Sequence, residues 1–153
     1  MHNIEIVEAS NDDFKDVVGL IKSLLVELEP SAKEEVENTA LNDIAKDLLA
    51  KSKIWVFVAK KDDINIGLIT LHECAAIYAG GVFGEVSELY VKPEFRSLKV
   101  GELLLSSAIE YGKLRGWKRL EVGSPSMSES PRTYKFYEKQ GFQCTGSRLR
   151  FLI

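Results

Sequence analysis

A segment that passes from a predicted strand into a predicted helix carries residues suited to binding an anion. It runs from Glu88 through a turn at Pro93 to Gly101. A helix N-terminus offers unpaired N–H groups and a partial positive charge, so it can hold a pyrophosphate. Arg96 and Lys99 add positive charges there, and Gly101 lets the backbone approach a bulky ligand. The alternative is a strand–helix joint with ordinary surface cations, since the glycine spacings of a P-loop and of a dinucleotide fingerprint are missing.

The histidines and cysteines do not suggest a metal centre. His2 and His72 are far apart in the chain, with no carboxylate or thiol cluster at ligand spacing, so no metal is expected. Cys74 and Cys144 occur in no metal or redox spacing. We expect both cysteines to be small buried hydrophobes, and their scarcity fits a reducing compartment.

The elements that must position the anion-binding segment follow from hydrophobic periodicity and turn residues. The predicted order is strand 4–9, helix 10–30, helix 41–51, strands 54–59, 64–72 and 83–91, helix 100–116, strand 119–122, helix 133–139 and closing strand 142–149. This β-α-α-β-β-β-α-β-α-β order predicts an α/β (α+β) fold. We expect a single domain over residues 1–153, with one mixed sheet and helices on its faces.

Composition narrows the class of protein. Apolar residues make up 45% and charged residues 28% of 153 residues, and the net charge is -3 with both signs interleaved. No basic stripe for nucleic acid is visible. The longest apolar run, Ile54–Ala59, is too short to cross a bilayer, and the N-terminus lacks the pattern of a secretory signal. We expect a cytoplasmic protein that binds neither nucleic acid nor membrane.

Two motifs resemble signatures of the GNAT superfamily of N-acetyltransferases. The first is similar to the family's Val-x-Pro-x-x-Arg followed by x-x-Gly-x-Gly, matched at positions 91, 93, 96 and 101. The second, at 133–142, is similar to Phe-Tyr-x-x-x-Gly-Phe. They occur in the family's order, and the likeness extends over nearly the whole chain. The resemblance implies a mostly antiparallel sheet with helices on both faces, and acetyl-CoA as cosubstrate without a metal.

The resemblance also implies which residues hold the donor. Backbone groups of the strand would bind the pantetheine arm, and those of the helix start would bind the pyrophosphate. The expected cofactor-binding residues are Leu89, Tyr90, Val91, Arg96, Ser97, Leu98, Lys99, Val100, Gly101, Glu102 and Ser130. Lys99, Ser97, Ser130 and Thr133 depart from the family's usual Gly, Gly, Asn and Ala. A lysine at the tight turn would restrict φ, so some strain is expected there.

Two catalytic residues are expected. The resemblance places Tyr137 as the acid that protonates the departing thiolate of CoA, although its ring could merely pack in the core. A lysine-like amine is mostly protonated at neutral pH and needs a base. Glu88, between Val86 and Tyr90 on one face of a buried strand, is the first candidate because desolvation raises a carboxyl pKa. Glu85 is the second, on the opposite face if the strand is regular.

The expected reaction moves an acetyl group to a primary amine of a small molecule or peptide, by direct attack in a ternary complex. The acceptor site should be lined by segments 28–42, 74–84 and 124–131, but their residues do not indicate which amine binds there. The alternatives are a non-catalytic acetyl-CoA sensor and an interaction module on the same fold. A homodimer through the alternating segment Ser147–Ile153 is plausible under each reading.

Overall fold

Five strands form one mixed sheet in the computed structural model, which describes residues 3–153. The strands lie in sequence order, β1-β2-β3-β4-β5. The first four pair antiparallel and β5 joins β4 in parallel. Their bounds are β1 Ile4–Glu8, β2 Trp55–Lys61, β3 Ile64–Ala76, β4 Gly81–Val91 and β5 Leu120–Val122. The mostly antiparallel sheet predicted above is therefore confirmed.

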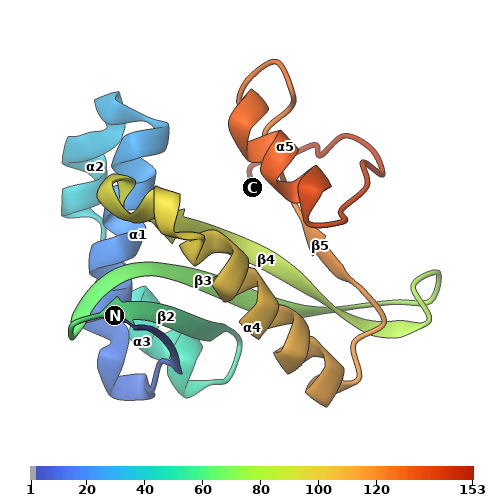
Figure 1. Ribbon diagram of the computed structural model, residues 1–153, viewed down its shortest axis with the longest axis horizontal. Coiled ribbons are helices and arrows are strands. Elements are labelled where there is room, and N and C mark those ends of the chain that lie inside the picture. The colour runs from blue at the N-terminus through green and yellow to red at the C-terminus, as the bar shows by residue number, and fades with distance from the viewer. Residues whose placement is uncertain (1–2) are drawn as a thin grey trace.

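Helices cover both faces of this sheet (Figure 1). On one face lie α1 Phe14–Leu28, α2 Lys33–Asn38 and α3 Leu41–Ala50, and on the other lies α4 Val100–Arg115. The last helix, α5 Pro131–Lys139, follows β5. The short α2 was not predicted, because its six residues carry a single buried side chain, Val36. Within the described residues no helix combines the length and the apolar character needed to cross a membrane.

The sheet separates two hydrophobic clusters. The cluster beneath α4 is built on Ile69, Leu71, Val86, Leu104 and Leu105. The cluster beneath α1 and α3 includes Val17, Leu20, Val56, Leu68 and Tyr90. Strand residues alternate between the two faces, so the long strands β3 and β4 contribute to both clusters.

A β-bulge changes which side chains of β4 share a face. Glu88 pairs with Thr70 and Glu85 pairs with His72, while the pairing shifts between Thr70 and Leu71, so that Ser87 is the extra residue. Thr70 and His72 are two residues apart on β3, so their partners Glu88 and Glu85 lie on the same face. The expectation that these two glutamates face opposite sides is therefore wrong.

The same bulge separates Glu88 from Val86. Val86 packs in the cluster beneath α4, whereas Tyr90 packs in the cluster beneath α1. Glu88 thus shares a face with Tyr90 and not with Val86, on the side covered by α1. The sequence could not reveal this, because a bulge is defined by the pairing of β4 with β3 and not by the residues of β4 alone.

The predicted closing strand 142–149 does not form. Residues 143–153 have no regular structure, and β5 remains the edge of the sheet. The side chains of Leu149, Phe151 and Ile153 are 90% exposed or more. Alternating apolar residues predicted a strand, but a strand also needs an edge to pair with, and within one chain this segment does not reach the edge of β5.

Candidate active site

The parallel strands β4 and β5 separate after a short contact. Their pairing covers only Gly84–Val86 of β4, and β4 continues to Val91 without a partner on that side. Gly84, at one end of this contact, leaves room for the Trp117 ring, because a Cβ there would overlap the ring. The unpaired half of β4 is an open edge inside the sheet.

Hydrogen-bond directions show which backbone groups face this open edge. Glu88 N–H donates to Thr70 Oγ1 and Lys92 N–H donates to Ile66 O, both on β3. Because N–H groups alternate along a strand, Tyr90 N–H also points to β3, while Leu89 and Val91 N–H point away from it. Of the three positions predicted to bind the donor, Leu89 and Val91 therefore present their N–H groups to the gap.

The N-terminus of α4 lies next to this edge in the chain. A 3₁₀ helix over Pro93–Leu98 leads into it, and Lys99 precedes its first residue with φ 59° and ψ 26°. A non-glycine residue in this left-handed region is strained, as the sequence predicted. Leu103 N–H donates to Lys99 O, and the N–H groups of the preceding turn have no intrahelical acceptor. Leu98, Lys99, Val100, Gly101 and Glu102 are the predicted pyrophosphate-binding residues in this segment, and Ser97 is a further residue predicted to bind the cofactor.

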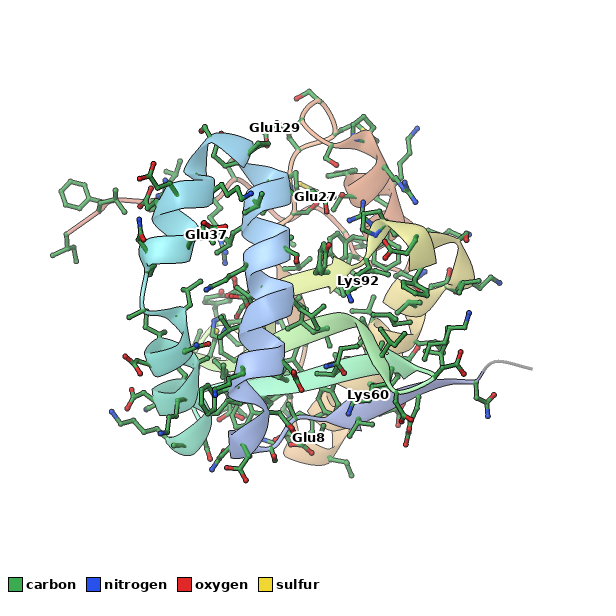
Figure 2. All side chains as sticks on the ribbon, turned by 90° about the vertical axis from the view of Figure 1, so that its left-hand side faces the viewer. Glu8, Glu27, Glu37, Lys60, Lys92 and Glu129 are labelled. Carbon is green, nitrogen blue, oxygen red and sulfur yellow. The ribbon has the colours of Figure 1, made fainter. Side chains whose placement is uncertain are left out.

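Arg96 is engaged with protein groups. Its Nε donates to Val91 O at 2.8 Å, and its Nη2 lies 2.6 Å from Glu27 Oε2 on α1. The hydrogen bond that the guanidinium donates to Glu27 raises its pKa. Figure 2 shows Glu27 on α1 and Lys92 in the segment where β4 ends. Arg96 thus ties the end of β4 to α1, a structural role that the sequence did not reveal.

A side chain of α5 lies against the first turn of α4. A Cβ on Gly101 would lie 3.3 Å from Phe136 Cζ, so glycine provides room for this ring. Ser130 immediately precedes α5, and its hydroxyl lies 2.9 Å from Thr133 Oγ1. The first turn of α4 therefore packs against the Phe136 ring of α5.

Tyr137 lies in the wall of a cleft of about 1300 Å³ between β5, α5 and the C-terminal segment. The residue is 7% exposed, and its ring packs edge-on against Phe136 and Phe142. Burial raises its pKa to about 12. The phenol therefore keeps its proton throughout the physiological pH range, whichever role it has.

Glu88 lies on the α1 face of the sheet, on the strand that carries Leu89 and Val91. Burial raises the pKa of its carboxyl. Its neighbour on the same face, Tyr90, is 7% exposed, and Arg96 lies over the Tyr90 ring. A half-desolvated carboxylate at this position can accept a proton from a group bound on the α1 side of the open edge.

A second polar group lies further along the same face and was not predicted. His72 Nδ1 lies 2.7 Å from Ser87 Oγ, and His72 Nε2 lies 3.5 Å from Glu85 Oε2. Glu85 also pairs with Arg148 of the C-terminal segment and contacts Cys74 Sγ. Burial, and secondarily Arg148, lowers the pKa of His72. The available signal was His72-x-Cys74, two side chains that share a face of β3 opposite Glu85.

Comparison with known proteins identifies the class. A family model described as an acetyltransferase (GNAT) domain matches residues 52–144. The chain is 32% identical over 123 residues to an uncharacterized N-acetyltransferase of Archaeoglobus fulgidus, covering 78% of this chain and 80% of that protein. It is 26% identical over 139 residues to the aminoalkylphosphonate N-acetyltransferase of Salmonella typhimurium, covering 91% and 84%.

The fold agrees with solved structures of the same class. An aminoglycoside N-acetyltransferase in complex with CoA matches with a TM-score of 0.76 at 18% identity, over 100% of this chain and 96% of that one. The chain belongs to the GNAT superfamily and is an N-acetyltransferase. Acetyl-CoA is the acetyl donor used by this family.

Proposed function

We propose that this protein transfers the acetyl group of acetyl-CoA to a primary amine of a small molecule by direct attack in a ternary complex. The observation that carries the proposal is the unpaired half of β4, which begins where β5 leaves it at Val86 and ends beside the N-terminus of α4. A thioester bound along this edge would meet backbone donors on the strand and on the helix.

The donor would be held by backbone groups. The N–H groups of Leu89 and Val91 point to the open edge and would pair with the pantetheine arm and polarise the thioester carbonyl. The N–H groups between Leu98 and Glu102, with Ser130 at the start of α5, would hold the pyrophosphate. Arg96 would act indirectly by fixing Val91 O, since its guanidinium is already paired with Glu27.

Glu88 would serve as the base for the acceptor amine. Its pKa is raised by burial, which makes the carboxylate a better proton acceptor than an exposed glutamate. It lies on the α1 side of the sheet, so the amine would approach from that side. Glu85 is the weaker candidate because its carboxylate is already paired with Arg148.

Tyr137 would protonate the departing thiolate. With a phenol pKa of about 12, complete proton transfer to a thiolate of pKa near 8.5 costs about 5 kcal/mol. This cost favours a proton that moves as the carbon–sulfur bond breaks, because a free thiolate could not deprotonate the phenol fully. The ring contacts with Phe136 and Phe142 would fix the hydroxyl in place.

The acceptor would be a small amine. A peptide remains the second possibility, since both were compatible with the sequence. The Salmonella relative is named for acting on an aminoalkylphosphonate, and the match covers more than four fifths of both proteins. Short amines that carry an acidic group are therefore the first acceptors to test, with aminoglycosides, polyamines and a peptide N-terminus as the comparison set.

Thiol release from acetyl-CoA across this set of amines tests the proposal directly. Turnover of one of these amines supports it, and absence of turnover with all of them, despite binding of acetyl-CoA, favours the sensor alternative. Binding is measured separately as a thermal shift. At a free concentration of 100 times Kd, acetyl-CoA should stabilise the fold by about 2.7 kcal/mol. An unchanged melting temperature would contradict both the enzyme and the sensor hypotheses, and only the interaction module would then remain.

We also propose that two copies associate through the C-terminal segment. Leu149, Phe151 and Ile153 are exposed, and β5 has a free outer edge along the cleft. Segment Ser147–Ile153 of one copy could pair with β5 of the other. Light scattering of the protein with and without residues 149–153 tests this, and a monomer in both cases would contradict it.

A further inference from the structure

We propose that His72, Cys74 and Glu85 form a binding site for one divalent transition metal ion of the zinc type. One ligand atom from each residue lies within 4.8 Å of the other two. The set contains an imidazole, a thiol and a carboxylate, which are the three side-chain groups that bind zinc in proteins. The site includes Glu85, the weaker candidate for the base, but it does not depend on the roles proposed above for Glu88 and Tyr137.

The distances fit a shared metal better than hydrogen bonds. His72 Nε2 lies 3.5 Å and Cys74 Sγ lies 3.8 Å from Glu85 Oε2. Two ligands on a tetrahedral zinc, each about 2.0–2.3 Å from the metal, are separated by about 3.3–3.7 Å. Two of the three distances between ligand atoms are thus close to those of a tetrahedral zinc site. The third pair of ligand atoms lies within 4.8 Å, so a side-chain movement of at most about 1 Å brings it to metal geometry.

The backbone keeps the three ligands together. His72 and Cys74 are two residues apart on β3 and share a face, and Glu85 is the direct cross-strand partner of His72. All three are partly buried. Ligands carried by paired strands hold their spacing without help from a loop, so a metal would meet a largely formed site.

Neighbouring groups orient the ligands as in metal sites. Ser87 Oγ lies 2.7 Å from His72 Nδ1, so a proton on Nδ1 donated to Ser87 leaves the Nε2 lone pair for the metal. Arg148 pairs with Glu85 Oε1, while His72 and Cys74 approach Oε2. The two oxygens of Glu85 therefore have separate partners, and a metal on Oε2 need not displace Arg148.

Three protein ligands leave one tetrahedral position for water or for an oxygen of a bound molecule. Glu85 and Tyr137 both line the cleft beside β5, so this position is reachable from the space that the tyrosine faces. We expected no metal because the two histidines are far apart in the sequence. That expectation did not consider that one histidine, one cysteine and one glutamate lie close together across the paired strands β3 and β4.

The test uses Co²⁺ as a spectroscopic substitute for Zn²⁺, added to chelator-treated protein in a thiol-free reductant. We expect one equivalent to bind, with visible bands of tetrahedral cobalt and a near-ultraviolet thiolate-to-metal band that Zn²⁺ abolishes. Absence of the thiolate band in the unmodified protein would overturn the proposal, whatever the behaviour of the variants.

Variants assign the ligands. Cys74→Ser should remove the thiolate band, and His72→Gln and Glu85→Gln should each weaken Zn²⁺ binding in calorimetry. Cys144→Ser is the matched control, because Cys144 is exposed on the C-terminal segment and should be neutral. Ser87→Ala should weaken Zn²⁺ by about 10–100-fold through the imidazole. A band that survives Cys74→Ser and disappears in Cys144→Ser would mean that the metal binds elsewhere.

Discussion

Gly101, in the first turn of α4, lies against the ring of Phe136 on α5. A methyl group on Gly101 would lie 3.3 Å from Phe136 Cζ and 3.4 Å from Phe136 Cε2. The lack of a side chain at Gly101 therefore serves the packing as well as the approach of a ligand. It lets α4 begin close to the Phe136 ring of α5. A side chain there must either move the ring or project toward the expected pyrophosphate.

Gly101→Glu should abolish acetyl-CoA binding, because it puts bulk and negative charge at the expected phosphate site. The gain in helix propensity over glycine, several tenths of a kcal/mol, is offset by the contact with Phe136, so the melting temperature should change little. Calorimetry with acetyl-CoA measures the effect. Gly19→Glu is the control, because Gly19 lies in α1 with nothing within 4 Å of an added Cβ. Unchanged affinity in folded Gly101→Glu would place the phosphates elsewhere.

Tyr137→Phe should lower kcat by about 10²–10⁴-fold while the Kd of acetyl-CoA changes little. The variant keeps the packing against Phe136 and Phe142 and removes only the proton donor. Steady-state kinetics with an accepted amine measures it, with Tyr78→Phe, on an exposed tyrosine, as the control. A rate within about threefold of the parent, with chemistry limiting, would assign the proton to water or to the newly formed ammonium.

Glu88→Gln should lower turnover and raise stability at neutral pH. Burial raises the pKa of Glu88 in the folded state, so the folded protein binds its proton more tightly than the unfolded chain does. Stability is then lost as pH rises from the unfolded pKa through the folded pKa. Glutamine cannot ionise, so its advantage over the parent should be present at pH 7 and absent below the unfolded pKa of about 4.3. Melting curves at both values check the sign, and an equal advantage at both would show that ionisation is not the cause.

The rate should show a related pH dependence. If Glu88 accepts the proton of the amine, the acid limb of kcat/KM lies above the ordinary range of glutamate, because its pKa is raised. No falling limb from Tyr137 is expected until pH approaches about 12. An acid limb that is unchanged in Glu88→Gln would exclude Glu88 as its source.

Lys99→Gly tests the strained turn before α4. Lys99 has φ 59°, and left-handed geometry costs a non-glycine residue about 1–2 kcal/mol. The extra freedom of glycine in the unfolded chain offsets about 0.4–1 kcal/mol, so stability should stay equal or rise by up to about 1.6 kcal/mol. If the ammonium contacts a phosphate, acetyl-CoA affinity should fall about tenfold. Ser52→Gly, also at positive φ but after α3, is the control that should leave affinity unchanged.

Much of the fold could be predicted from the chain, but some local features could not. Helical spacing and glycine at the end predicted α4, and Gly116 indeed follows it in left-handed geometry. The bulge at Ser87 and the pairing of Arg96 with Glu27 depend on contacts between segments far apart in the sequence. The alternating tail after Phe142 has strand character, but it pairs with no strand among residues 3–153, which the structure describes. Local pattern predicts what a segment can form, whereas tertiary contacts decide what it pairs with.

The short parallel contact between β4 and β5 has a consequence for how the protein opens. Only Gly84–Val86 and Leu120–Val122 hold the two strands together, whereas β3 and β4 pair from Gly67–Ala76 to Gly81–Val91. Amide protons of β5 should therefore exchange with solvent well before those of β3, because the smaller unit opens at lower free energy. Partial unfolding would begin beside the open edge of β4. Acetyl-CoA bound between β4 and β5 would slow hydrogen exchange in β5 first.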